Sequence, residues 1–307
     1  MTLALTAPLL APGYLLLRDA VSTPRSYLSD AALGLSQAAP RALPQDFAVA
    51  LASSVVDGGV VVKALLILGL WLAGWGAARL AGAVVPDAGI AGQCVAVTIA
   101  IWNPYVAERL LQGHWSLLVG YGCLPWVAVT VLSPKWHSAR ENPRSDRVER
   151  YFGGVLALVF WLALAGLTPT GLMLAATVAL ACALAPGAGR SRWWCAGVSL
   201  AASVTAAVPW LVASVVAGGW ASTGGAQQAG VVAFAARAEP GLGTIGSLAS
   251  LGGIWNAEAV PPSRTTLFAV VSAAVLLTVV AVGVPTLIGR RVTPLLAIAV
   301  VAVVAPA

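Results

Sequence analysis

Five polar residues that could do chemistry lie within twelve positions of one stretch, interleaved with aromatic residues. They are Asn103, Glu108, Arg109, Gln112 and His114, and the stretch joins two strongly apolar runs. Polar groups at a membrane boundary are costly, so such a cluster indicates a binding site. Arg109 and His114 are candidate ligands for a phosphate, because a guanidinium can donate two hydrogen bonds to one. The alternative is an interfacial hairpin anchored by aromatic side chains, with Arg109 reaching toward lipid head groups.

Carboxylates that could act as a general base lie before this stretch. Asp19 directly follows the first apolar run, and a base there could take a proton from an acceptor hydroxyl. The alternative for Asp19 is a simple ion pair with Arg18. Asp46 is the second candidate base, and its alternative is the N-cap of a short helix. Either Asp46 or Asp57 could help to hold a divalent cation, although no spacing identifies a metal site.

A second polar and aromatic pattern lies in a later loop. Trp255 and Asn256 follow Gly252 and Gly253, and this glycine pair predicts a close approach of the backbone. The indole could stack on a sugar ring and the amide could hydrogen-bond to it. The alternative is an aromatic anchor at the membrane interface.

The composition defines the class of protein that must position these residues. Hydrophobic residues make up 59% of the chain and charged residues only 9%, with a mean hydropathy of +0.89. A soluble domain carries about 25% charged residues. The long runs rich in Ala, Leu and Val predict an all-α, polytopic helical membrane protein. The net charge of +6 lies largely between the runs, which argues for membrane topology and against nucleic-acid binding.

The apolar runs predict about nine transmembrane helices in a single multi-span domain over residues 1–307. The three loops expected on the extracytoplasmic side are 18–57, 102–114 and 218–264. Because the chain stops within the ninth run, we expect it to be truncated at its C-terminus. The expected spans are Leu3–Leu17, Gly59–Ala78, Ala88–Ile101, a fourth ending near Ser133, Phe152–Leu167, a sixth ending near Ala185, Trp193–Ala217, Leu267–Ile288 and a ninth from Pro294.

The placement of basic residues predicts the orientation. Cytoplasmic loops are rich in Lys and Arg, and four alternate loops carry most of them if the N-terminus is cytoplasmic. These basic loops also suggest contact with anionic membrane lipids. The basic residues are Arg79; Lys135, Arg140, Arg144, Arg147 and Arg150; Arg190 and Arg192; and Arg290 and Arg291.

With these patterns in view, the chain resembles the glycosyltransferase-C superfamily, and within it the actinobacterial enzymes that build cell-wall arabinan and mannan. The resemblance is carried by the many spans, by a long first outer loop opening on Arg18-Asp19, by NPYVAERLLQGHW and by GGIWNAE. It implies a polyprenyl-phosphate sugar donor, a cell-envelope glycan or glycolipid acceptor, and a plasma-membrane location. It also implies that an acidic residue of the first outer loop, here Asp19 or Asp46, is the catalytic base.

The resemblance therefore predicts an inverting arabinosyl- or mannosyltransferase that works in cell-wall biogenesis. Asp19 would deprotonate the acceptor, and Arg109 or His114 would stabilise the departing phosphate. Two alternatives remain open at this point: a transporter or flippase of lipid-linked sugars, and a non-catalytic subunit of a cell-wall assembly complex. A transporter would be expected to carry ionisable residues at mid-span depth.

Overall fold

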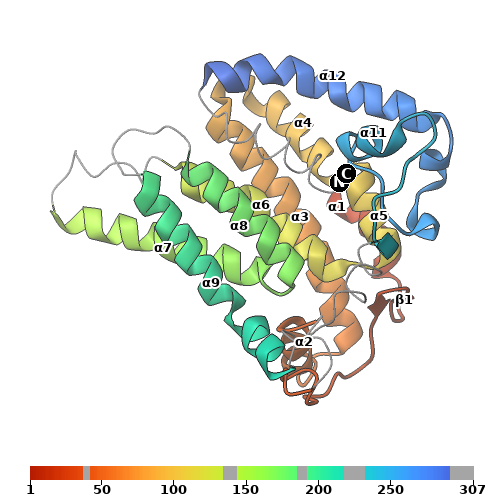
Figure 1. The fold of residues 1–307 in the computed structure, drawn as a ribbon, viewed down its shortest axis with the longest axis vertical. Coiled ribbons are helices and arrows are strands. Elements are labelled where there is room, and N and C mark those ends of the chain that lie inside the picture. The colour runs from red at the N-terminus through yellow and green to blue at the C-terminus, as the bar shows by residue number, and fades with distance from the viewer. Residues whose placement is uncertain (37–41, 134–143, 185–191, 218–231, 291–307) are drawn as a thin grey trace.

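The computed structural model describes residues 1–36, 42–133, 144–184, 192–217 and 232–290. Within these ranges the chain is mostly helical, as its composition predicts, and one two-residue hairpin supplies the only strands (Figure 1). The main helices are α3 (Gly58–Val84), α4 (Gly89–Ile101), α6 (Trp115–Leu132), α7 (Arg144–Ala165), α8 (Pro169–Ala183), α9 (Arg192–Val216) and α12 (Phe268–Gly289).

Five helical segments in the described ranges are long and apolar enough to cross a membrane, which supports a multi-pass membrane protein. One of them, Pro86–Gln112, comprises α4 and the short helices on either side of it. Two shorter apolar helices, Phe152–Ala165 and Pro169–Ala183, occupy the expected fifth and sixth spans. The expected ninth span lies outside the described residues, so a total of nine stays a prediction.

The expected first span, Leu3–Leu17, is wrong as a continuous helix. Helix α1 (Thr2–Thr6) gives way to a 3-10 helix, η1 (Ala7–Leu10), and the chain then becomes extended. Pro8 opens η1, and Pro12 is followed by Gly13, whose φ is +117°. Proline removes a backbone donor and this glycine takes a non-helical conformation, so together they end the helix. The prediction of a cytoplasmic N-terminus depended on this span and is not tested.

The core is built around α3 and α6. Gly69 of α3 and Gly122 of α6 face each other so closely that a Cβ on Gly122 would collide with the carbonyl oxygen of Gly69. Small residues allow such close backbone approach between helices in a membrane. On its other side α6 packs with α7, α8 and α9 around buried residues such as Cys123, Leu158 and Ala175.

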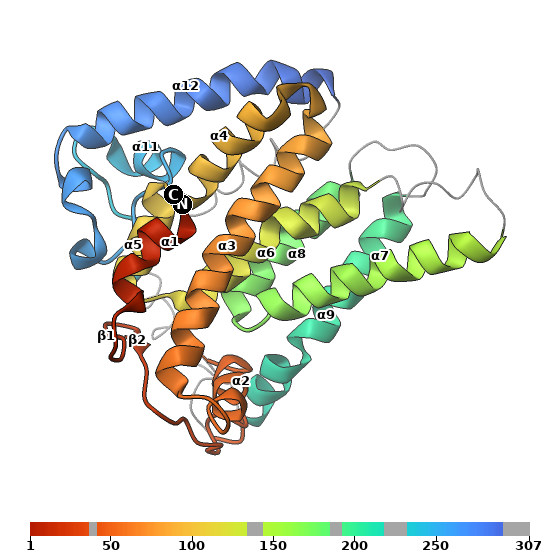
Figure 2. The same cartoon turned by 180° about the vertical axis from the view of Figure 1, so that it is seen from behind.

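Short elements and loops surround the starts of α3 and α6 (Figure 2). They belong to segments far apart in the sequence. These elements are β1 (Leu16–Leu17), β2 (Ala20–Val21), α2 (Gln45–Ala52), α5 (Pro104–Gln112), α11 (Gly243–Ala249), η4 (Ala257–Ala259) and η5 (Pro262–Thr265). They continue past α5 to α12, with α2 beside the start of α3 and α11 beneath α12 (Figure 2). At the opposite end of the bundle η2 (Pro86–Ala88) connects α3 to α4.

Candidate functional site

Helix α5 is the element that positions the candidate site, and its sequence fixes both of its ends. Asn103 caps the N-terminus, where its Oδ1 accepts a hydrogen bond from the Val106 N–H at 2.9 Å, and Pro104 opens the first turn. Gly113 ends the helix in the left-handed conformation, with φ +86°. Asn103 is buried and donates to the Ile99 carbonyl, so it supports α5 and is not free to bind a ligand.

The hairpin of β1 and β2 packs against the C-terminal end of α5. Arg18 and Asp19 are its two turn residues, because Leu17 pairs with Ala20. A Cβ on Gly113 would lie 2.6 Å from the Leu17 carbonyl oxygen, so this contact requires glycine. Arg18 has a φ of +50°, which is uncommon for a residue other than glycine. Its guanidinium donates to the carbonyl of Leu111, which holds the turn in place.

Asp19 meets His114 and Gln112 at this contact. The Asp19 carboxylate oxygen Oδ2 lies 2.8 Å from His114 Nε2 and 2.9 Å from Gln112 Nε2. The Asp19 N–H also donates to the Gln112 carbonyl at 3.1 Å. The side chain of Asp19 is 55% exposed and that of His114 is 25% exposed. Among the described residues the hydrogen bonds to this carboxylate all fall on Oδ2, and Oδ1 accepts none.

The surroundings of His114 favour its neutral form. Burial lowers the pKa of the imidazole, the nearby Arg109 charge lowers it further, and the Asp19 carboxylate opposes both effects only in part. A neutral ring that donates from Nε2 to Asp19 has no N–H at Nδ1, and Nδ1 is buried without a partner among the described residues. His114 therefore fits an orienting partner of Asp19 better than a phosphate ligand.

Arg109 is the remaining candidate for binding phosphate. Its guanidinium lies 5.0 Å from the centre of the Tyr105 ring, and within the described residues it forms no ion pair with a carboxylate. The Tyr105 ring lies 5.4 Å from the Tyr121 ring. Tyr121 in turn lines an apolar cavity of about 480 Å³ whose walls include Ala73 and Leu124. Among the described residues Arg109 is thus a cation without a carboxylate partner. The rings of Tyr105 and Tyr121 connect it to the apolar cavity.

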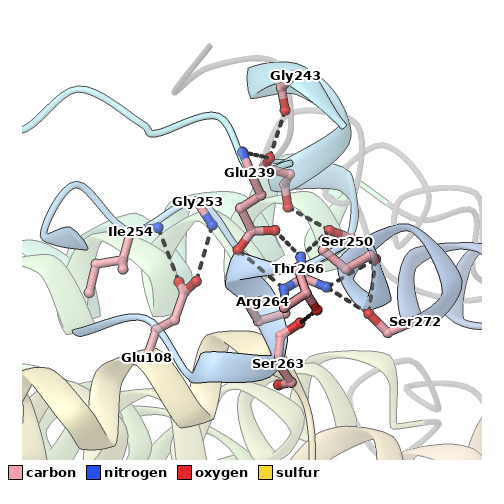
Figure 3. A network of polar contacts seen from close by, with 12 residues as sticks. Glu108, Glu239, Gly243, Ser250, Gly253, Ile254, Ser263, Arg264, Thr266 and Ser272 are labelled. Carbon is pink, nitrogen blue, oxygen red and sulfur yellow. Dashed lines mark hydrogen bonds and ion pairs between the residues drawn. The ribbon is translucent and has the colours of Figure 1, made fainter. Parts of the chain in front are cut away.

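Glu108 fixes the later outer loop to α5. Its side chain is buried with 1% of its surface exposed, and it accepts hydrogen bonds from the N–H groups of Gly253 and Ile254 at 3.3 and 3.1 Å (Figure 3). Gly253 has a φ of +91°, which explains the glycine there. The sequence predicted that Glu108 belongs to a binding site. In the structure its carboxylate holds the backbone at Gly253 and Ile254.

A buried ion pair braces the other side of the same loop. Glu239 and Arg264 are each 3% exposed and form a two-point contact, with Arg264 Nε 3.1 Å from Glu239 Oε1 (Figure 3). Arg264 also donates to Ser250 Oγ at 2.7 Å and to Ser272 Oγ of α12 at 2.8 Å. The pair therefore ties the loop to α12.

Asn256 and Trp255 follow the clamped glycines and differ in their roles. The Asn256 side chain is used internally, because Nδ2 donates to Gln112 Oε1 at 2.7 Å and Oδ1 accepts from the Glu258 N–H at 3.0 Å. Trp255 is 36% exposed and makes an edge contact with Phe234, at 4.8 Å between ring centres. Only Trp255 is thus available as a stacking surface.

Two expectations about the first outer loop are corrected. Asp46 is not the N-cap of the short helix, because α2 begins at Gln45 with Pro44 in the cap position. Burial raises the pKa of Asp46. Arg18 does not pair with Asp19 and instead lies 3.8 Å from the Glu258 carboxylate. Asp57 caps α3 and accepts the Tyr14 hydroxyl at 2.7 Å, and this bond keeps the Asp57 pKa low.

The structure thus brings Asp19 together with His114 directly and with Asn256 through Gln112, while no described contact links Asp46 to them. Sequence reasoning listed Gln112 in the polar stretch but gave it no role; its spacing of four residues from Glu108 on one helix was the available signal. Among the described residues no group of three or more His, Cys, Asp or Glu side chains could hold a metal ion.

Comparisons with protein-family models, with curated proteins and with solved structures found no match.

Proposed function

We propose that the chain is a membrane glycosyltransferase that moves a sugar from a polyprenyl-phosphate donor to a cell-envelope glycan or glycolipid. The single observation that carries the proposal is the Asp19 carboxylate. It is half exposed at one end of the helical bundle, and its Oδ2 is held by two nitrogens at 2.8 and 2.9 Å. A base for glycosyl transfer must be reachable and oriented, and this carboxylate is both.

In the proposed reaction Asp19 Oδ1 takes the proton of the acceptor hydroxyl. The hydroxyl oxygen forms a bond to the anomeric carbon, the bond between that carbon and the phosphate oxygen breaks, and the polyprenyl phosphate leaves with the electron pair. Attack from the face opposite the phosphate inverts the anomeric centre. Arg109 stabilises the negative charge that grows on the leaving phosphate.

The donor's chemistry matches the surroundings of Arg109. An isoprenoid chain is apolar and suits the cavity of about 480 Å³ that Tyr121 lines. The Tyr121 ring contacts the Tyr105 ring, and Arg109 lies over the Tyr105 ring. Arg109 would therefore bind the phosphate at the bundle end where Asp19 lies. We expect this end to face the outside of the plasma membrane, because the three loops predicted to be extracytoplasmic meet there, through the contacts of Asp19 with Gln112 and of Gln112 with Asn256.

The distribution of charge along the helices favours the enzyme over a transporter. Helices α4, α6, α8 and α12 contain no Asp, Glu, Lys or Arg, and in α3 the two charged residues, Lys63 and Arg79, lie toward opposite ends. A path for a polar substrate through the bundle would need polar groups at mid-depth.

The test is transfer of labelled sugar from a polyprenyl-phosphate donor in membranes that contain the full chain. We expect Asp19→Asn to lower the rate at least about 100-fold, the lower range for a lost general base. Asp30→Asn, an exposed carboxylate of the same outer loop, is the matched control and should transfer at the wild-type rate. Transfer that survives Asp19→Asn and stops in Asp46→Asn would move the base to Asp46. Absence of transfer by the wild-type chain would contradict the enzyme.

A further inference from the structure

Gln112 lies between the candidate base and the later outer loop, and it is 3% exposed. It contacts Asp19 twice, through its side-chain Nε2 at 2.9 Å and through its carbonyl oxygen, which accepts the Asp19 N–H at 3.1 Å. On its other side Gln112 Oε1 accepts a hydrogen bond from Asn256 Nδ2 at 2.7 Å. Three parts of the chain thus meet at one amide.

The direction of these hydrogen bonds is fixed from a backbone group. The N–H of Glu258 can only donate, so the Asn256 atom that it contacts must be the amide oxygen. The other end of the Asn256 amide is then the NH₂ group, and the Gln112 atom that it contacts must be the oxygen. The NH₂ group of Gln112 therefore has to face Asp19. In these hydrogen bonds the Asp19 side chain only accepts, as an ionised carboxylate does.

We propose that Gln112 is a positioning residue that presents the ionised carboxylate of Asp19 to the acceptor, and that Asn256 sets the orientation of the Gln112 amide. This inference rests on the proposed glycosyl transfer. Gln112 and His114 both occupy Asp19 Oδ2, so rotation of the carboxylate is blocked and Oδ1 is the oxygen that receives the proton. Glu108 contributes indirectly, because it clamps Gly253 and Ile254 just before Asn256.

Two substitutions at Gln112 separate positioning from a purely structural role. Gln112→Met keeps the length of the side chain and removes the donor to Asp19. We expect it to lower kcat by up to about 100-fold, the cost of a misplaced catalytic group, with KM for the donor unchanged. Gln112→Glu places a second carboxylate against Asp19. Because two neighbouring carboxylates resist ionising together, the acid limb of the pH–rate profile should move up by about one pH unit or more.

The experiment measures kcat, KM and the pH–rate profile of the full-length chain in membranes, for wild type, both Gln112 variants and Gln93→Met. Gln93 lies in α4, outside the contacts of the site, so this matched control should behave as wild type. Size-exclusion chromatography and the melting temperature check that each variant is folded. The rates are then compared at equal amounts of folded protein.

The outcomes separate this inference from the proposed function. A wild-type chain without transfer activity would remove the proposed function and this inference with it. An active wild type with Gln112→Met equally active would overturn the inference alone. A Gln112→Glu variant whose rate falls without movement of its acid limb would also overturn it, because the residue would then serve only the fold. Reduced kcat together with the shifted limb supports the proposal.

Discussion

At the scale of single residues, the pairing of Asp19 with His114 divides the work between them. Asp19 is the more exposed of the two, and His114 lies behind it with one nitrogen on the carboxylate and the other buried. A neutral imidazole that donates to a carboxylate can orient it without adding a charge that competes with Arg109. In the proposed reaction this division leaves Asp19 as the base and Arg109 as the phosphate ligand.

The lowered pKa of His114 predicts a dependence of stability on pH. The ordinary pKa of 6.5 applies to the unfolded chain and the folded value is lower, so below about pH 6.5 the unfolded state binds more protons. The contribution is fully present above pH 6.5 and is lost as the pH falls through the folded pKa. We expect the melting temperature in detergent to drop less between pH 7.5 and 5.5 in His114→Gln than in wild type.

His137→Gln is the matched control for this measurement, because His114 and His137 are the two histidines of the chain. An unchanged pH dependence in His114→Gln would contradict the assignment of the neutral form to His114.

At the scale of elements, α5 organises the end of the bundle that carries the candidate site, because its length and its ends are set locally. The Asn103-Pro104 pair starts the helix and Gly113 stops it after nine residues. One turn at its end then carries Gln112 and His114 toward the hairpin, while Glu108, one turn earlier, faces the later loop. A short helix with a defined start and stop can therefore hold two outer segments in fixed register.

The ion pair of Glu239 and Arg264 should act as the lock of the later loop. In Glu239→Gln the buried Arg264 loses its counter-charge, and breaking such a pair costs about 3–5 kcal/mol. We expect the segment between residues 232 and 266 to become sensitive to limited proteolysis. The double variant Glu239→Gln with Arg264→Met should regain part of the resistance, because it leaves no unpaired charge. A single variant as resistant as wild type would show that the pair does not hold this segment.

At the scale of the whole molecule, charged groups of both signs lie at both ends of the bundle. Asp19 lies beside Arg18 and next to α5, which carries Glu108 and Arg109. At the other end Arg290 contacts Asp87. The expectation that the candidate site lies outside the membrane therefore rests on the three loops predicted to be extracytoplasmic, which meet at the contacts of Asp19 with Gln112 and of Gln112 with Asn256.

Labelling of single cysteines tests this orientation. In a Cys94→Ser background, which removes the exposed native thiol, a membrane-impermeant maleimide should label Asp30→Cys in intact cells. It should label Asp87→Cys only after the cells are permeabilised, because α3 separates the two positions. The background chain without an added cysteine is the control. The reverse pattern would place the candidate site in the cytoplasm and exclude an extracytoplasmic acceptor.

Much of the fold could be predicted where local chemistry decides it. The expected eighth span, Leu267–Ile288, agrees with α12 to within one residue at each end, because a long apolar run has only the helix available in a membrane. The same reasoning failed at Leu3–Leu17, where Pro8, Pro12 and Gly13 outweigh hydropathy. Hydropathy counts apolar residues but does not register the loss of backbone donors.

The site was predicted less completely. Asp19 and His114 were each singled out by type and by place near a span end. The use of Asn256 and Glu108 as internal partners was not predicted. An amide or carboxylate that binds a sugar and one that binds the backbone have the same sequence signature, and only the contacts distinguish them.

The sequence by itself indicated a helical membrane protein and located several of its long helices, such as α12, because these depend on apolar runs within a few residues of the chain. The tertiary structure alone decided which polar groups meet. Asp19 and His114 are 95 positions apart, and Gln112 and Asn256 are 144 apart. Contacts over such separations depend on how the hairpin and the later loop pack on α5, and no local pattern of residues specifies that packing.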